Sequence, residues 1–301
     1  MVKTFCETTI VGVLVFMGSQ LVGCQAGAGG APHGIVGVGT TKPDLFGLPA
    51  EYRALHAALE QTFGRPVRFN AQPNGRAIGQ QLEQGSIAFA IMSAAEYSAA
   101  QDSSKLNLLA TAKNPLGNTS RKAHIITRAS DTRFKGISDC AGKRFAFGTY
   151  GDALTDTAAQ KTLEANGVPA KKLLPELLLP PPLSMEGRLY ATNAANAISL
   201  DLTVNAGVID EVMFNRLPDT GGNPLIGPSK DQFKIIGDTS AIPELAVVAG
   251  PSADAALTEK LTAYLLNEAK NNKDLCQQLG ISGFGPADRA AYDAAANLLK
   301  K

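Results

Sequence analysis

The sequence contains no tryptophan, and aromatic residues make up only 6% of its 301 residues. Clefts that bind sugars usually stack the sugar rings on aromatic side chains, so this scarcity counts against a carbohydrate ligand. The formal net charge is only +1, which excludes an overall basic field for nucleic acid and a polybasic membrane patch. Four cysteines are too few for a disulfide scaffold. With 45% hydrophobic and 18% charged residues, the composition indicates a globular chain of one large or two moderate domains rather than a disordered one.

A short apolar segment, Ile10–Met17, lies close to the N-terminus. It is too short to span a bilayer, which takes about 20 residues, and it suits the hydrophobic region of a secretory signal. The segment Leu21–Cys24 (LVGC) resembles a bacterial lipobox, in which the cysteine receives the lipid; the alternative is an ordinary signal peptide with a chance cysteine. We therefore predict a lipoprotein signal peptide over residues 1–23, a membrane anchor at the lipidated Cys24, and a flexible tether over residues 24–34.

Segments that favour strands alternate with segments that favour helices along the rest of the chain. This alternation predicts an α/β fold with mostly parallel sheets. The predicted strands are Gly34–Gly39, Pro66–Asn70, Ile87–Met92, Leu106–Ala112, His124–Thr127, Lys143–Phe147, Val208–Met213, Phe233–Gly237 and Glu244–Ala249. The predicted helices are Pro49–Phe63, Gly75–Gln84, Ala94–Ala100, Thr155–Asn166, Asn193–Asn205, Ala253–Ala269 and Ala287–Lys300. The Leu- and Pro-rich stretch Leu173–Leu183 favours neither.

The motifs of common enzymes are incomplete or missing in this sequence. Gly37 and Gly39 begin a dinucleotide-binding pattern, but Lys42 stands where its third glycine belongs. There is no nucleophile elbow and no metal-binding spacing, and the three histidines are isolated. We therefore expect no catalytic residue, no cofactor and no metal. Cys140 and Cys276 could pair in an oxidising compartment or remain two free thiols, and the sequence leaves both open.

Polar side chains lie at the ends of several predicted strands, where α/β proteins bind ligands beside helix N-termini. The hydroxyl residues at these points are Thr40, Thr41, Ser93, Thr119, Ser120, Thr149, Tyr150 and Thr155. Serine and threonine are also ordinary helix caps, so only their convergence in one cleft would indicate an oxyanion site. Asp152 and Asp210 could instead face a cation, and hydroxyl donors opposite carboxylates would suit a zwitterion. The alternative is that Asp152 caps a helix and Asp210 is solvated.

Several segments, taken in their order along the chain, carry a family resemblance. They are Tyr52–Val67, Leu82–Ala90, Ile137–Gly148, Ala206–Asp210, Ile242–Pro243 and Gly283–Tyr292. Together they resemble the phosphate/phosphite/phosphonate-type substrate-binding lipoproteins of ABC importers, over nearly the whole chain that follows the signal segment. Individual segments resemble short patterns of that family. For example, Ile137–Gly148 (ISDCAGKRFAFG) resembles the family pattern I-x-D-L-x-G-K-R-V-A-F-G, with Cys140 and Phe145 at the Leu and Val positions.

The resemblance implies a type II periplasmic-binding fold, in which two α/β lobes are joined by hinge-crossing strands near His124–Arg128 and Phe233–Gly237. Lobe one would comprise residues 35–127 and 236–301, and lobe two residues 128–235. It also implies an extracytoplasmic, lipid-anchored and monomeric protein with no enzymatic activity and no nucleic-acid partner. Such a protein captures a small anionic or zwitterionic solute between its lobes and presents it to an ABC permease in the membrane.

Departures from the family pattern bear on the ligand. The family shows an S-T-S-G-like anion loop after A-F-G, whereas this chain has Thr149–Asp156, which includes two acids. Asp152 would repel a free phosphate or phosphonate if it faced the cleft. Asp210 matches a family aspartate, where the resemblance implies that it could contact an amino group. Two alternatives stay open: a lipoprotein on the same fold that senses a ligand for a membrane receptor, and an enzyme on the same scaffold.

Overall fold

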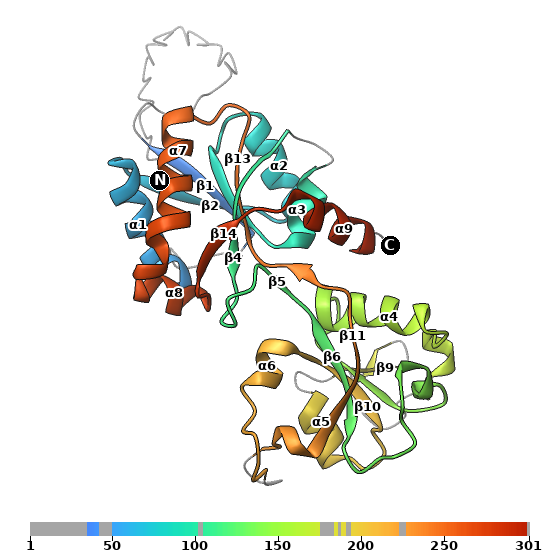
Figure 1. The fold of residues 1–301 in the computed structure, drawn as a ribbon. Coiled ribbons are helices and arrows are strands. Elements are labelled where there is room, and N and C mark those ends of the chain that lie inside the picture. Colours follow the sequence, from blue (N-terminus) through green and yellow to red (C-terminus); the bar gives the residue numbers. More distant parts are fainter. Residues whose placement is uncertain are drawn as a thin grey trace, which may run out of the picture.

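The computed structural model describes residues 35–41, 50–101, 105–174, 184–185, 188–190, 194–222 and 227–299. The predicted signal peptide and the predicted tether, which begins at Cys24, lie outside the described residues, as does most of the Leu- and Pro-rich stretch. Figure 1 shows the described chain as two α/β units, each built on its own sheet and joined by a narrow connection.

The first sheet has six strands in the order β14-β4-β13-β3-β1-β2. Its strands are β1 Val36–Thr40, β2 Val67–Ala71, β3 Phe89–Met92, β4 Asn107–Lys113, β13 Ala246–Ala249 and β14 Gly283–Pro286. Its helices are α1 Arg53–Phe63, α2 Gly75–Glu83, α3 Ala94–Gln101, α7 Ala255–Ala263, α8 Lys273–Leu279 and α9 Arg289–Leu299. Alternate residues of β3 face opposite layers: Phe89 and Ile91 pack with α1, α7 and α8, whereas Ala90 and Met92 pack with α2, α3 and α9. This explains why the strand is apolar throughout.

The second sheet also has six strands, in the order β11-β6-β10-β7-β9-β8. Its strands are β6 Ala123–Arg128, β7 Phe145–Phe147, β8 Ser184–Met185, β9 Arg188–Tyr190, β10 Ala206–Asp210 and β11 Phe233–Asp238. Its helices are α4 Ala159–Ala165, α5 Ala194–Leu200 and α6 Glu211–Asn215. A π-helical turn, Ala153–Ala158, leads directly into α4. One face of the sheet packs on α5 through Ile126, Ile209 and Phe233, and the other buries Phe145, Phe147 and Leu163.

The two sheets are connected by the short strands β5 Ser120–Arg121 and β12 Ile242–Pro243, which pair with each other in antiparallel register. β5 continues into β6 and β12 follows β11, so the chain enters and leaves the second sheet side by side (Figure 1). A hydrogen bond from the Ala123 amide to the Thr239 hydroxyl ties the two connections together. The C-terminal helix α9 packs against both β12 and the π-helical turn Ala153–Ala158. Residues that belong to different sheets therefore lie close together at this connection.

The prediction of mostly parallel sheets is wrong. β1 runs parallel to β2 and β3, and β7 runs parallel to β9 and β10, but the other strand pairs among the described residues are antiparallel. Strands joined by a helical crossover are parallel, as expected. Strands on the path between the sheets break this pattern, because β6 enters the second sheet and β13 returns to the first from the opposite direction.

The predicted strand Val208–Met213 is also wrong in its second half. The strand ends at Asp210 and the chain turns into α6 at Glu211. The Asp210 carboxylate accepts hydrogen bonds from the amides of Val212 and Met213, so it caps the helix and ends the strand.

Other elements differ in length or were not predicted. The helix predicted over Asn193–Asn205 extends only over Ala194–Leu200. Helix α8 was missed, although its N-cap Asn272 and its left-handed Gly280 are ordinary boundary signals. Strand β14 was missed because its sequence, Gly-Phe-Gly-Pro, reads as a turn; the proline is tolerated because β14 lies at the sheet edge. Cys140 and Cys276 are free thiols, and Cys140 is fully buried.

Candidate functional site

A cavity of about 320 Å³ lies at the connection between the two sheets, and we call it the cleft. Residues Ser93 to Ala95, Asn114 and Pro115 line it from the first sheet, and Asp152 to Leu154 and Asp210 line it from the second. Arg121 on β5 and the segment Ile242–Leu245 line it from the connection, and Leu279 to Ile281 complete it. A solute in the cleft would therefore contact both α/β units.

Arg121 forms the centre of an ion-paired cluster at the cleft. Its Nη1 lies 2.9 Å from Oδ2 of Asp210, and its Nη2 lies 2.9 Å from Oε2 of Glu244. Both carboxylates are largely buried, with 16% of the Asp210 side chain and 9% of the Glu244 side chain exposed, whereas Arg121 is 36% exposed. The guanidinium thus links the end of β10 in the second sheet to the segment that follows β12.

The protonation of the cluster follows from burial and pairing. Burial by itself lowers the pKa of Arg121, but the charges of Glu244 and Asp210 outweigh it and hold that pKa above its ordinary value. Burial raises the pKa of Glu244, and Arg121 only partly opposes this rise. Arg121 therefore stays charged, while Glu244 accepts a proton at a higher pH than an exposed glutamate does.

The N-terminus of α3 carries Ser93, one of the predicted donors. The Ser93 amide donates to Oε2 of Glu96 at 2.7 Å, and the Glu96 amide donates to the Ser93 hydroxyl at 3.3 Å, which is a capping box. The second oxygen of Glu96 accepts a hydrogen bond from the Thr41 hydroxyl. Thr41 is therefore committed to Glu96 rather than to the cleft, and a carboxylate already lies at the positive end of this helix.

The loop after β7 places Asp152 in the cleft lining. Its Oδ1 accepts hydrogen bonds from the amide of Leu154 at 3.1 Å and from the amide and hydroxyl of Thr155 at 2.7 and 2.8 Å. Asp152 therefore caps the π-helical turn, which is the helix-capping role that the sequence offered as an alternative to contact with a cation. The Thr155 hydroxyl is committed to that cap, and Thr149 and Tyr150 are exposed and outside the described lining of the cleft.

The remaining predicted donors lie elsewhere. Thr40 is buried and its hydroxyl donates toward the Tyr52 hydroxyl at 3.4 Å. Thr119 and Ser120 line a separate surface cavity of about 440 Å³, together with Lys113 and Lys122. Because side chains alternate along a strand, Arg121 faces the cleft while its neighbours face this other cavity.

Of the predicted residues, Ser93, Asp152 and Asp210 line one cavity. Arg121 and Glu244 were not predicted from the sequence. They lie 89 and 34 positions from Asp210 and meet it only through the pairing of β5 with β12. Among the described lining residues the basic side chain is Arg121, and the acidic ones are Asp152, Asp210 and Glu244. The cleft therefore carries an excess of negative charge.

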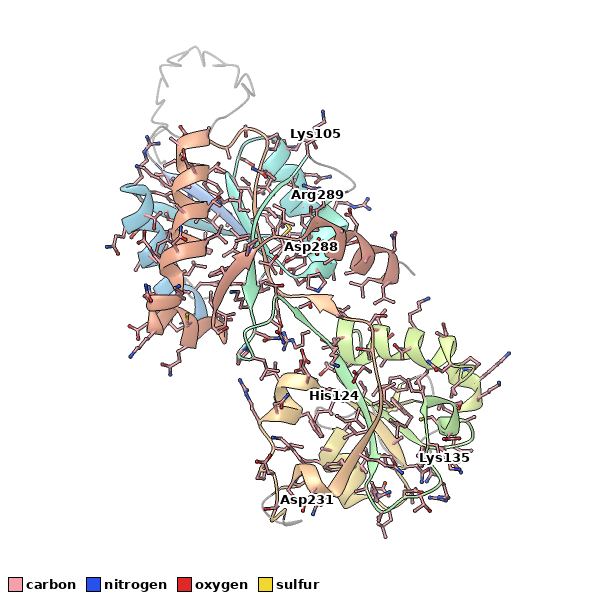
Figure 2. The ribbon with its side chains drawn as sticks, viewed as in Figure 1. Lys105, His124, Lys135, Asp231, Asp288 and Arg289 are labelled. Carbon is pink, nitrogen blue, oxygen red and sulfur yellow. The ribbon has the colours of Figure 1, made fainter. Side chains whose placement is uncertain are left out.

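His124 lies on β6 in the second unit (Figure 2). It is not among the residues that line the cleft. Its Nδ1 is 2.7 Å from Oδ1 of Asp238, and its ring packs edge-on against Phe214. The described residues contain no group of three or more metal-ligating side chains of His, Cys, Asp or Glu placed around one point. The histidine therefore contributes to packing beside the connection.

The family model of the phosphonate periplasmic substrate-binding proteins of ABC transporters matches residues 47–292. This chain belongs to that family. None of the curated proteins matches the sequence. The family resemblance expected from the sequence motifs is confirmed, and the family's transport role is favoured over a receptor-linked sensor on the same fold.

Solved structures of other proteins share the fold. XAC2383 from Xanthomonas citri, bound to chloride ion, is 15% identical with a TM-score of 0.61, and the match covers 88% of this chain and 97% of that chain. PhnD1 from Prochlorococcus marinus, in complex with methylphosphonate, is 14% identical with a TM-score of 0.56 and the same coverage. The likeness confirms the type II periplasmic-binding fold.

Membership of the family gives the chain a coarse function. It is an extracytoplasmic substrate-binding protein that takes a small solute and works with an ABC permease. In the part of the chain that the structure describes, no helix has both the length and the apolar character needed to cross a bilayer.

Proposed function

We propose that this substrate-binding protein captures a small zwitterion, with an oxyanion at one end and a cationic group at the other, in the cleft between its two α/β units. The observation that carries the proposal is the charge of the cleft, where the single guanidinium of Arg121 is set against the carboxylates of Asp152, Asp210 and Glu244 among the described lining residues. The three carboxylates favour a solute that brings positive charge.

A solute with only negative charge would meet repulsion in this cleft. At a separation of about 4 Å and an effective dielectric near 20, a pair of like charges costs about 4 kcal/mol before salt screening. The hydroxyl donors expected to offset this cost at Thr41 and Thr155 are committed to carboxylates of the protein itself. A cationic group beside the oxyanion turns the repulsion into attraction.

The oxyanion of the zwitterion has donors in the same cleft. The guanidinium of Arg121 has five N–H groups, and the two ion pairs use only some of them. The Ser93 hydroxyl accepts from Glu96 and keeps its own hydrogen to donate. The family's phosphonate association and the methylphosphonate bound by PhnD1 support an oxyanion of this kind.

Calorimetry with matched ligands tests the proposal. We expect aminomethylphosphonate to bind more tightly than methylphosphonate, and 2-aminoethanesulfonate more tightly than ethanesulfonate. A hydrogen bond to a charged group contributes roughly 1.5–3 kcal/mol, so Asp210→Asn should reduce the amine preference about ten- to a hundredfold. Asparagine caps helices about as well as aspartate, so the variant keeps α6 and loses the charge.

Asp254→Asn is the matched control. Asp254 caps α7 by accepting from the Leu257 amide, away from the cleft, so this variant should keep the wild-type preference. Wild-type protein that binds methylphosphonate as tightly as aminomethylphosphonate would contradict the proposal, and simple anion binding would then be the better account.

Anchoring, oligomeric state and chemistry belong to the same proposal. The LVGC tetrapeptide at residues 21–24 supports a lipid anchor on Cys24. Mass spectrometry of the N-terminal peptide from membrane-extracted protein tests this: we expect the added mass of acyl chains on Cys24, and a peptide without that mass would contradict the anchor. We propose that the protein acts as a monomer and releases its solute unchanged, which the transport role of the family supports. Recovery of a chemically altered ligand would contradict that part.

A further inference from the structure

The Arg121 cluster points to a more specific means of recognition, which rests on the proposed function. We propose that Arg121 determines the specificity of the cleft by exchanging its partner: the zwitterion inserts into the Arg121–Asp210 ion pair. The oxyanion of the solute then takes the place of Asp210 on the guanidinium, and the cationic group takes the place of Arg121 on Asp210.

The exchange leaves both Arg121 and Asp210 paired with an opposite charge only when the solute is a zwitterion. One ion pair inside the protein is replaced by two ion pairs with the solute, and no charge is left without a partner. A simple anion that displaced Asp210 would leave that carboxylate unpaired, although only 16% of its side chain is exposed. A buried charge without a partner is strongly destabilising, so the internal ion pair rejects simple anions.

Both members of the pair have a second contact that holds them in position after the exchange. Asp210 uses Oδ2 for Arg121, while its Oδ1 stays bound to the amides of Val212 and Met213 at 2.7 and 3.3 Å. Arg121 uses Nη1 for Asp210, while its Nη2 stays bound to Glu244 at 2.9 Å. The groups that face the solute are therefore already ordered, which reduces the entropic cost of binding.

The residue type matters for this role. A guanidinium is planar and presents donors in two directions, so Arg121 holds Glu244 with one nitrogen while another is released. A lysine ammonium in the same position is a single point charge and does not offer this fixed geometry. Arg121 also lies on β5, within the connection between the sheets, so an oxyanion bound to it is held between the two units.

The test compares three probes on wild-type protein, Arg121→Gln and Asp210→Asn by calorimetry. The probes are aminomethylphosphonate, methylphosphonate and methylamine. Arg121→Gln should weaken the binding of aminomethylphosphonate about ten- to a hundredfold. Methylamine should bind this variant at least as tightly as it binds wild type, because it no longer competes with Arg121 for Asp210. Asp210→Asn should show the opposite pattern: it should bind aminomethylphosphonate more weakly than wild type does, and methylphosphonate more tightly.

Arg133→Gln is the matched control, because Arg133 is an exposed arginine that also pairs with a carboxylate, that of Asp131, and does not line the cleft. Arg121→Lys, which keeps the charge, should bind aminomethylphosphonate more weakly than wild type. A purely structural role for Arg121 predicts that all three probes weaken together in Arg121→Gln, and that result would overturn the exchange. Equal affinity of wild type and Arg121→Gln for aminomethylphosphonate would overturn it as well. The wild-type preference between aminomethylphosphonate and methylphosphonate reports separately on the proposed function.

Discussion

Glu244 is a residue of the cleft through which we expect pH to act on binding. Burial raises the pKa of its carboxyl above the ordinary value of 4.5, and Arg121 opposes this rise only in part. When ionised, Glu244 holds Arg121 in place and adds negative charge to the cleft. When protonated, it retains its shape but loses the charge. The affinity for a cation-bearing solute should therefore fall as Glu244 takes up its proton.

This gives a pH prediction with Glu244→Gln as its reference. At neutral pH wild type should bind aminomethylphosphonate about tenfold more tightly than Glu244→Gln, the size expected for one charged contact. As the pH falls through the raised pKa of Glu244, the ratio of the two affinities should approach one, because protonated glutamate resembles glutamine. Titration of the phosphonate itself is the same for both proteins and cancels in the ratio. A ratio that stays constant from neutral pH to 4.5 would contradict the prediction.

Single residues of the cleft could be predicted from the sequence only where a local sequence pattern indicated them. Asp210 was found because it matches an aspartate of the family pattern. Asp152 was found in the loop after the predicted strand Lys143–Phe147, and Ser93 directly after the predicted strand Ile87–Met92. Arg121 and Glu244 follow no motif; they are ordinary charged residues in the sequence. They meet at the cleft because two strands of two residues each pair across a separation of more than 120 positions.

At the scale of elements, the turn from Gly148 to Thr155 fixes the position of Asp152. The Gly148 amide donates to the Thr155 carbonyl at 3.1 Å, which brings the two ends of the turn together. A Cβ atom on Gly148 would lie only 1.9 Å from the Thr155 hydroxyl oxygen and 2.3 Å from its Cβ, so glycine is required by this close approach. Thr155 in turn holds Asp152.

Gly148→Ala should therefore displace Thr155 and, with it, Asp152. Overpacking of this kind lowers the free energy of unfolding by about 1–3 kcal/mol. The displaced turn should also weaken the binding of aminomethylphosphonate. Gly136→Ala is the control, since a Cβ atom on Gly136 meets nothing within 4 Å and its φ of −166° is extended backbone. Urea unfolding measures the stability and calorimetry measures the affinity. Equal urea midpoints for Gly148→Ala and Gly136→Ala would show that the close approach is not maintained.

Elements with a strong local signal were predicted well, and those set by tertiary pairing were not. The apolar run at β3 and the amphipathic helix α1, which ends at the left-handed Gly64, match their predictions within a few residues. β14 exists because β4 offers it an edge, and the direction of β13 depends on the chain's path through the second unit. The strand predicted to run to Met213 ended early because the Asp210 side chain competes for the amides that would continue it.

In the whole molecule, we expect capture of the solute to change the distance between the two units. They meet at the paired connections β5 and β12 and along α9, and the cleft is lined from both sides (Figure 1). A solute that contacts Arg121, Asp210 and the N-terminus of α3 together favours the arrangement in which these groups lie closest. Binding should therefore shift the population toward a closed form.

Small-angle scattering of the protein with and without ligand measures closure of the two units. Saturating aminomethylphosphonate should reduce the radius of gyration of wild type, and methylphosphonate at the same concentration should do so to a smaller extent. Asp210→Asn should remove this difference. Tight binding of aminomethylphosphonate with an unchanged radius of gyration would contradict capture by closure of the two units.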